Sequence, residues 1–254
     1  MEIKKLLTPY NHYDGTIDRI KYIVIHYVGA TGGAEANCKW YAGGNRSASA
    51  HYFVDFDGSI WQSVEDKDIA WHCGAKSYIH SECRNANSIG IEMCVRNNGS
   101  KADTSRDWYF EDATVNAAIE LTRELMDKYH IPADHVIRHY DVTGKICPNP
   151  YVYNDGKHTW DQFKAALTAP QEGWVKDSKG WWYRNADGSW PVSEWAYLEW
   201  EGKKNWYYFG SDGYMLSSQI LILGKEAFVL GPDGAMMEGE ITLTTNERGA
   251  LVIL

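Results

Sequence analysis

The sequence has no apolar run that approaches the length of a membrane-spanning helix. Its first fifteen residues include two lysines but no apolar stretch of about 7–15 residues, so the N-terminus is not typical of a secretory signal. Basic residues are outnumbered, with 25 Lys and Arg against 34 Asp and Glu, and they form no basic stripe. We therefore expect neither membrane insertion nor nucleic-acid binding, because nucleic-acid recognition requires clustered positive charge.

Cysteine is also sparse. The 5 cysteines are odd in number and widely spaced, which does not predict a disulfide framework. We interpret Cys38, Cys73, Cys83 and Cys94 as small buried residues with free thiols. Cys147 stands in a different context, considered below.

Aromatic residues, by contrast, are abundant and unevenly distributed. There are 12 Trp and 17 Tyr, and the tryptophans gather late in the chain. The character of the sequence changes around TAPQEG, residues 168–173, and from Gln171 onward the chain carries 7 basic and 12 acidic residues. We predict one domain over residues 1–168, a linker over 169–173 and a second module over 174–254.

The first region contains strand patterns. Residues 21–28 form a nearly continuous β-branched apolar run, which is typical of a central strand covered on both faces. Residues 50–62 predict two strands joined by a turn at Asp57-Gly58. Residues 88–95 predict another interior strand.

Helical patterns alternate with these strands. Over residues 112–130 the apolar side chains fall on one helical face, and Pro132 ends the pattern. A short strand at Val136–Ile137 leads into a predicted loop over residues 138–148. Residues 159–167 predict a last helix that begins at a capping threonine. This order predicts an α/β domain with a mixed central sheet and flanking helices.

The second region contains a weak repeat. Three segments end in Asp-Gly at a similar offset: GWWYRNADG (180–188), NWYYFGSDG (205–213) and EAFVLGPDG (226–234). One hairpin cannot bury its own apolar face, so hairpins that stack must supply the core. We therefore predict a small all-β module of four hairpins near residues 174–183, 195–208, 220–230 and 241–254.

Three residues of the first region have the chemistry of metal ligands. His26 ends the central strand, and alone it would be interpreted as a hydrogen-bonded core residue. His139 and Cys147 lie eight residues apart in one predicted loop. Two imidazoles and one thiolate match the three protein ligands of a catalytic zinc site, which keeps its fourth position open. A structural site would need a fourth ligand, and no close-spaced candidate occurs.

Five strings, in order, resemble the type-2 N-acetylmuramoyl-L-alanine amidases, a family that includes phage endolysins and is related to the peptidoglycan recognition proteins. The strings are IVIHYV, SAHYFVDFDGSIWQ, AWHCG, NSIGIEM and RHYDVTGKICP, all within residues 1–168. The resemblance implies the zinc amidase fold and bacterial peptidoglycan as the substrate. It also implies one Zn²⁺ per chain, with His26, His139 and Cys147 as its ligands.

The same resemblance implies roles for other residues. Glu92 matches an acidic residue beside the metal and would act as general base, with a structural salt bridge as the alternative. Ala50 stands where some relatives carry a tyrosine, which leaves proton transfer to Glu92. Lys145 matches a lysine that stabilises the oxyanion, with a solvated loop lysine as the alternative. His72 is expected to line the groove and contact substrate, or to be structural, and His51 is expected to be structural.

The hairpins resemble, more weakly, the cell-wall-binding repeats of choline-binding proteins. The resemblance implies these ligand-binding aromatics: Trp174, Trp181, Tyr207, Tyr208, Trp195 and Trp206. The first two with one of the tyrosines would form a cage, and the last two a partial cage that faces Val229. Aromatic faces attract quaternary ammonium groups by roughly 0.5–2 kcal/mol per contact, and an acidic module suits a cation such as choline. The alternative is that these rings only form the core between hairpins.

The resemblance implies a hydrolase that cleaves the amide bond between N-acetylmuramic acid and L-alanine of the stem peptide. Two alternatives stay open: a non-catalytic peptidoglycan-recognition module, and a zinc endopeptidase that cuts within the stem peptide. Cys147 argues against the first, because such binders commonly lack this ligand. The expected lack of a secretory signal fits a phage or prophage endolysin that is cytoplasmic on synthesis and reaches the cell wall through a separate pore.

Overall fold

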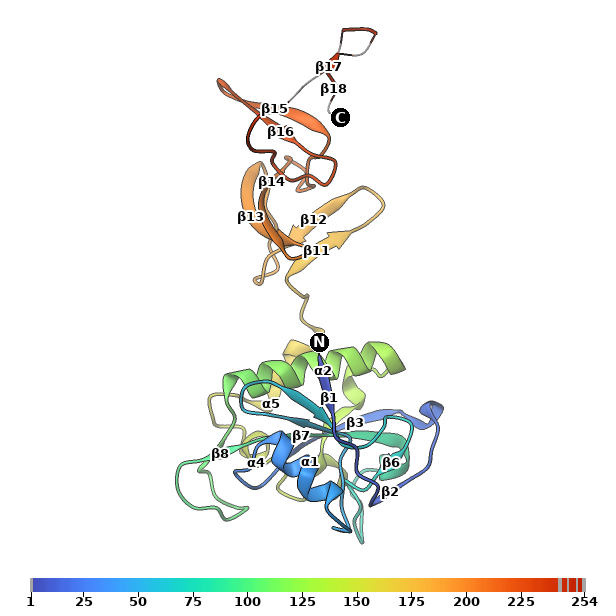
Figure 1. Cartoon of the computed structure of the whole chain (residues 1–254). Helices are drawn as coiled ribbons and strands as arrows, with labels where there is room; N and C mark the ends of the chain where they lie inside the picture. The colour runs from blue at the N-terminus through green and yellow to red at the C-terminus, as the bar shows by residue number, and fades with distance from the viewer. Residues whose placement is uncertain (1, 242–243, 246, 250, 253–254) are drawn as a thin grey trace. The chain divides into compact units, whose positions relative to one another are not determined.

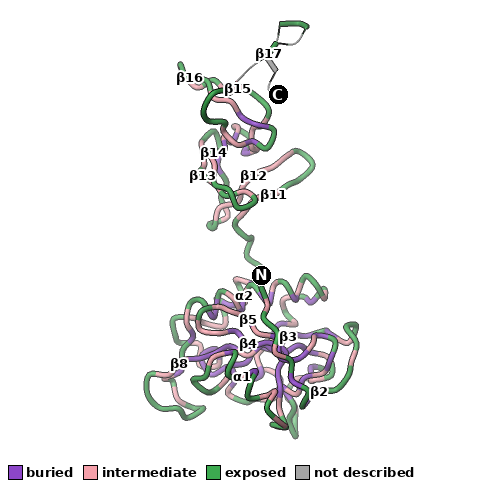
Figure 2. The backbone as a smooth tube through the Cα atoms, in the orientation of Figure 1, coloured by how far each residue is buried: buried purple, intermediate pink, exposed green. Residues whose placement is uncertain are grey.

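The computed structural model describes residues 2–241, 244–245, 247–249 and 251–252. They belong to two compact units, Met1–Ala169 and Pro170–Leu254, drawn from blue to red in Figure 1. Buried residues are densest in the sheet of the first unit, shown in purple in Figure 2. Among the described residues, no helix is both long enough and apolar enough to cross a membrane.

A six-stranded mixed sheet forms the centre of the first unit, in the order β1-β5-β4-β7-β3-β10. The strands are β1 Ile3–Lys5, β3 Tyr22–Tyr27, β4 Tyr52–Val54, β5 Ile60–Gln62, β7 Ser88–Met93 and β10 Val136–Arg138. Neighbouring strands are parallel except β4 and β5, which form the predicted hairpin. Gly58 takes a φ of +83° in its turn, a conformation that favours glycine. The predicted α/β class is confirmed.

Helices cover both faces of this sheet (Figure 1). The α-helices of the unit are α1 Ala34–Ala42, α2 Asp112–Tyr129, α3 His139–Thr143, α4 Asn149–Tyr153 and α5 Trp160–Thr168. The helices α2 and α5 pack on the face that carries Ile23, Ile25, Ile89 and Ile91, and these residues share the main core. The helix α1 packs on the other face, around Phe53.

Shorter elements complete the unit. The strand pairs are β2 His12–Tyr13 with β6 Ile69–Ala70, and β8 Arg96–Asn97 with β9 Trp108–Tyr109. Three 3₁₀ turns occupy Ile17–Arg19, Asn85–Asn87 and Ala133–His135. All five cysteines are buried free thiols.

The segment predicted as a loop over residues 138–148 is partly helical, which corrects that prediction. Arg138 caps α3 on its N-terminal side, because its side chain and backbone both bond to the carboxylate of Asp141. Gly144 then ends α3 with a φ of +80°. A single helical turn is too short to produce a recognisable apolar period, so the sequence pattern did not reveal it.

Hairpins make up the second unit, as predicted. The strand pairs are β11 Gly173–Lys176 with β12 Trp181–Arg184, β13 Glu194–Trp200 with β14 Lys203–Phe209, β15 Gln219–Leu223 with β16 Glu226–Leu230, and β17 Thr244–Thr245 with β18 Leu251–Val252. Successive hairpins are joined by backbone bonds from Met215 N to Trp181 O and from Met236 N to Trp206 O, each 2.8 Å. The prediction for residues 241–254 falls partly outside the described residues.

The cap of α5 provides a test of the fold. The hydroxyl of Thr159 accepts the Gln162 N–H at 3.2 Å, and the Gln162 side chain accepts the Thr159 N–H at 3.0 Å. Thr159→Ala should lower the free energy of unfolding of this unit by about 1 kcal/mol, measured by chemical denaturation followed by circular dichroism. Thr168→Ala, in the last turn of the same helix, is the control and should change it by less than about 0.5 kcal/mol. Equal losses in the two variants would contradict the capping role.

Candidate functional site

Three metal-ligand side chains meet at one end of the sheet. His26 lies near the end of β3, His139 begins α3, and Cys147 follows α3 in the chain. One ligand atom of each residue lies within 4.8 Å of the others. All three side chains are buried, with residue exposures of 1%, 6% and 2%. The structure therefore brings together the three residues that the sequence analysis selected as ligands.

The connection between α3 and α4 holds two of these residues in place. The Tyr140 N–H donates to the Cys147 carbonyl at 2.7 Å, which fixes the far end of the turn beside its start. Arg138 also donates to the Tyr151 carbonyl at 2.9 Å, so α4 is tied to the residue before His139. This local network sets the spacing between the imidazole and the thiol without a contribution from substrate.

Burial puts these groups in a state that suits a cation. It lowers the pKa of His139 to about 3 and that of His26 well below its ordinary value, so both rings stay neutral and can donate a lone pair. Burial also raises the pKa of the Cys147 thiol, which therefore needs a nearby cation to ionise. His139 Nδ1 is buried and has no hydrogen-bond partner in the described part of the chain. Two neutral imidazoles and a thiol with an unused buried nitrogen fit a zinc ion.

Glu92 lies beside this cluster on β7. It pairs with His26 across the parallel β3–β7 ladder, and its Oε1 is 3.9 Å from His26 Nδ1. Its side chain is 16% exposed, and Oε2 has no partner among the described residues. Burial raises the pKa of Glu92 to about 8, against the opposing effect of the Lys145 charge. A carboxylate with a raised pKa next to a candidate metal site can take up a proton near neutral pH.

A groove of about 540 Å³ opens beside the cluster. Its lining includes His139 and His72, the exposed Lys145, and Trp71 and Lys76 on the loop that follows β6. The ammonium group of Lys145 can therefore interact electrostatically with a charged group that is bound in the groove. Trp71 and Lys76 are not among the residues predicted from the sequence, because neither matches a metal-binding or catalytic pattern.

The two remaining histidines of interest are buried and bonded to the protein. His51 Nδ1 accepts the Gly90 N–H at 3.0 Å, and His51 Nε2 lies 3.1 Å from the Asp68 carbonyl. This arrangement agrees with the expected structural role of His51. His72 borders the groove. Its Nδ1 lies within hydrogen-bond distance of His26, and its Nε2 lies within hydrogen-bond distance of Ser88. Its nitrogens are therefore already engaged without any substrate.

In the second unit, the rings of Trp174 and Trp181 both pack against Trp200. The ring centroids lie 4.6 Å and 4.5 Å from that of Trp200, and Trp174 Nε1 donates to the Glu199 carbonyl at 2.9 Å. Tyr207 is buried against Trp174 with a centroid distance of 4.9 Å. Trp200 belongs to the extension of the β13–β14 hairpin, whose strands have seven residues where those of β11–β12 have four. Trp200 is not among the residues predicted for the first cage.

A second aromatic cluster leaves an open pocket of about 240 Å³, lined by Trp195, Trp206, Phe228 and Met236. Phe228 lies 5.1 Å from Trp195 between ring centroids, so the next hairpin presents Phe228 to this cage. The expectation that it presents Val229 is corrected. Adjacent strand residues point to opposite faces, and Val229 pairs with Ile220 on the other face of its hairpin.

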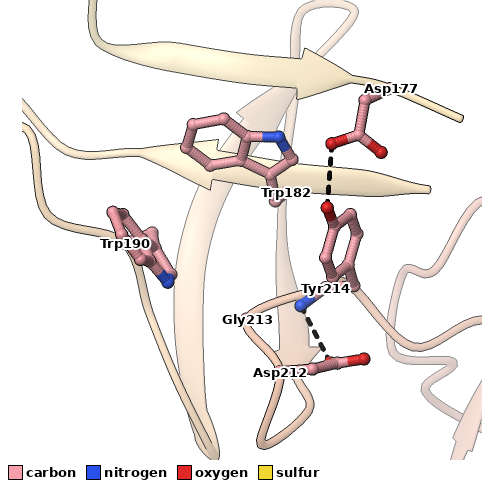
Figure 3. Close-up of a pocket in the computed structure, with 6 residues that line it drawn as sticks. All are labelled: Asp177, Trp182, Trp190, Asp212, Gly213 and Tyr214. Atoms are coloured by element: carbon pink, nitrogen blue, oxygen red, sulfur yellow. Dashed lines mark hydrogen bonds between the residues drawn. The ribbon is translucent and has the colours of Figure 1, made fainter. Parts of the chain in front are cut away.

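A third pocket, of about 210 Å³, lies between Trp182, Trp190 and Tyr214 (Figure 3). The Tyr214 hydroxyl donates to Asp177 at 2.8 Å, and Asp212 accepts the Tyr214 N–H at 3.2 Å, as the dashed lines in Figure 3 show. Asp212 also pairs with Lys179 at 2.9 Å. Both carboxylates at this pocket are thus satisfied within the protein, and the pocket does not require a cationic ligand.

The comparisons with known proteins agree with this geometry. Residues 17–150 match the model of the Amidase_2 family, described as N-acetylmuramoyl-L-alanine amidase. The chain therefore belongs to the N-acetylmuramoyl-L-alanine amidase family.

Individual relatives are similar over the same region. A probable N-acetylmuramoyl-L-alanine amidase of Bacillus licheniformis is 33% identical over 159 residues, which are 58% of this chain and 42% of that protein. The structure of PlyL gives a TM-score of 0.52 at 27% identity and covers 67% of this chain and 99% of that chain. A mutant endolysin from Bacillus subtilis gives a TM-score of 0.52 at 27% identity, with 66% and 99% covered. The chain spans less than half the length of the first curated relatives that it matches.

The burial of His51 predicts a pH dependence of stability. Burial lowers the pKa of His51 to about 3, whereas an unfolded histidine takes up its proton near 6.5. Between these values the unfolded state binds more protons, so the free energy of unfolding falls as the pH is lowered, by up to about 1.4 kcal/mol per pH unit from this ring. His51→Asn keeps an acceptor for the Gly90 N–H but removes the titrating group.

The measurement is denaturation of both proteins in the presence of a chelator. The free energy of unfolding of the wild type minus that of His51→Asn should be constant above about pH 7 and should shrink as the pH falls from about 6.5 to about 4. A difference that does not change with pH would contradict a neutral, buried His51.

Proposed function

We propose that this protein is a zinc-dependent N-acetylmuramoyl-L-alanine amidase that cleaves the bond between N-acetylmuramic acid and L-alanine in bacterial peptidoglycan. The observation that carries the proposal is the convergence of His26, His139 and Cys147 beside Glu92 and an open groove. Membership of the amidase family supports the same reaction. Residues 1–168 would carry the chemistry, and residues 174–254 would hold the enzyme on the wall.

The two histidines and Cys147 would hold the zinc ion, which when bound supplies a Lewis acid that polarises the scissile carbonyl and lowers the pKa of water. Glu92, 3.9 Å from His26 Nδ1, would accept the proton of the attacking water and later return it to the leaving amine. Its Oε2 is buried and has no hydrogen-bond partner among the described residues, so this oxygen is free for the exchange. The methyl group of Ala50 has no proton-accepting atom.

Lys145 would stabilise the negative charge that develops on the carbonyl oxygen. It lies on the lining of the groove together with His139, and its charge already acts on the pKa values of Glu92 and His139. A cation near a developing oxyanion lowers the barrier because it stabilises the negative charge of the transition state.

The two competing functions predict different products. A recognition module would release nothing, and an endopeptidase would cut between amino acids of the stem peptide. The amidase separates intact glycan strands from intact stem peptides that begin with L-alanine. Mass spectrometry of digested peptidoglycan therefore distinguishes the three functions in one experiment.

For the second unit, we propose binding to a cationic decoration of the wall, with choline as the first candidate. The binding pocket would be the one between Trp195, Trp206 and Phe228. Trp200 packs against Trp174 and Trp181 and would exclude a ligand from the first cage. With a wall-binding module beside an amidase unit, the protein would act as a phage or prophage endolysin, consistent with its similarity to endolysin structures.

Glu92→Gln tests the chemical step. The variant should keep one zinc ion per chain and an unchanged fold, because the carboxamide fills the same space, but it should lose about 10²–10⁴-fold in turnover. Turnover is measured as released stem peptide, and zinc by elemental analysis. Cys147→Ala is the contrasting variant and should lose the metal itself. Near-normal turnover by a zinc-loaded Glu92→Gln protein would show that Glu92 is not the base.

Calorimetry with choline tests the second unit. We expect one site per chain with a dissociation constant in the millimolar range, because a few cation–π contacts supply only about 4 kcal/mol. Trp206→Ala should abolish this binding, since Trp206 forms one wall of the open pocket. Trp190→Ala, an exposed tryptophan of the same unit outside that pocket, should not. Absence of heat at tens of millimolar choline, or binding that survives Trp206→Ala, would contradict the assignment.

A further inference from the structure

The ring of His72 lies between a candidate metal ligand and a buried hydroxyl. His72 Nδ1 is 3.0 Å from His26 Nε2, and His72 Nε2 is 3.1 Å from Ser88 Oγ. The Ser88 hydroxyl in turn donates to the Arg84 carbonyl at 2.7 Å. These side chains are almost completely buried, with residue exposures of 1% for His26, 8% for His72 and 0% for Ser88. The proposed chemistry does not account for this chain of bonds.

The donor and the acceptor of each of these hydrogen bonds follow from the last acceptor, the Arg84 carbonyl. A carbonyl can only accept, so Ser88 spends its single proton on Arg84 and must accept from His72 Nε2. In the neutral form of an imidazole, a proton on Nε2 leaves Nδ1 as an acceptor, and this is the form in which His72 Nδ1 accepts from His26. His26 Nε2 must then carry the proton of its own ring. The lone pair of His26 is therefore on Nδ1, the nitrogen that faces Cys147 Sγ at 3.7 Å.

A missing side chain makes room for this arrangement. Gly90 lies between Ser88 and Glu92 on the same face of β7, and a β-carbon there would lie 2.5 Å from His72 Cγ and 2.8 Å from Nδ1. The φ of Gly90 is not in the left-handed region, so space rather than backbone conformation requires glycine here.

The backbone on both sides of this contact is also held. Gly90 forms two hydrogen bonds with His51. The Gly90 N–H donates to His51 Nδ1 at 3.0 Å, and the Gly90 carbonyl accepts the His51 backbone N–H at 3.1 Å. The side chain of Asn85 accepts the backbone N–H groups of His72 and Cys73 at 3.1 Å and 2.8 Å. The ring of His72 can therefore relax little from its position over β7.

We propose that His72 is a positioning residue for the metal site. His72 acts through His26 and does not contact the reacting atoms. The Ser88–His72 pair fixes the tautomer and the ring orientation of His26, and Gly90 provides the space. A metal-ligating histidine usually donates its other N–H to a carboxylate, a carbonyl or water, and here the acceptor is a second imidazole. The inference rests on the proposed role of His26 as a zinc ligand.

The test compares zinc affinity of full-length variants by competition with a chromophoric chelator. His72→Leu removes the acceptor and should weaken zinc binding by about 10–100-fold. His72→Asn places an amide oxygen near the position of Nδ1 and should recover most of the loss. Gly90→Ala leaves every donor and acceptor in place but displaces the ring, so it should also weaken binding. His158→Leu, a histidine that bonds to Asp112 away from the site, is the control and should bind as the wild type does.

Two further measurements separate positioning from folding and from the metal site itself. Chelator-treated His72→Leu must unfold in one cooperative transition, and the absorption spectrum of the cobalt-substituted protein should change in that variant and return in His72→Asn. Zinc affinity of a folded His72→Leu within twofold of wild type would overturn the proposal, as would equal losses in the leucine and asparagine variants. A wild-type chain that binds no zinc would instead overturn the metal site, and the positioning role with it.

Discussion

The parallel register of β3 against β7 is the constraint on which the site depends. It sets His26 beside Glu92 and Val24 beside Gly90, all on the face of the sheet opposite α2. Because side chains alternate along a strand, a slip of one residue would turn either His26 or Glu92 into the apolar core and separate the two side chains. The isoleucines on the alternate positions of both strands fix that register, since they are buried against α2 and α5. Core packing therefore determines the geometry of the candidate site.

Much of this arrangement could be predicted where the information is local. The apolar run of β3, the Asp57-Gly58 turn and the Thr159 cap each depend on a few consecutive residues, and each was located from the sequence. The three candidate ligands could be selected because their types and order resemble a known pattern. Their convergence could not be derived, because 121 residues separate His26 from Cys147 and only the fold closes that distance.

The relationships that sequence did not provide are contacts between elements. The hydrogen bond from His26 to His72 joins residues 46 positions apart. The sequence around either histidine contains no pattern that identifies the other as its partner. The open aromatic pocket was misassigned to Val229 because the choice between Val229 and Phe228 depends on which face of β16 meets the preceding hairpin. The packing of Trp200 against Trp174 and Trp181 could not be predicted, because it depends on how far the β13–β14 hairpin extends beside the β11–β12 hairpin.

The bonds between successive hairpins have an energetic consequence. The backbone N–H of Met215 bonds to the first hairpin, and the backbone N–H of Met236 bonds to the second. The Met215 side chain also lies against Gly234, in the turn that follows the third hairpin. In such a linear array the folding free energy is close to a sum of terms for each hairpin and each junction between neighbours. The stack around Trp200 and the pocket beside Phe228 belong to different junctions. Because Met215 contacts both junctions, their contributions should not add independently, and a substitution that weakens one junction should also change the other.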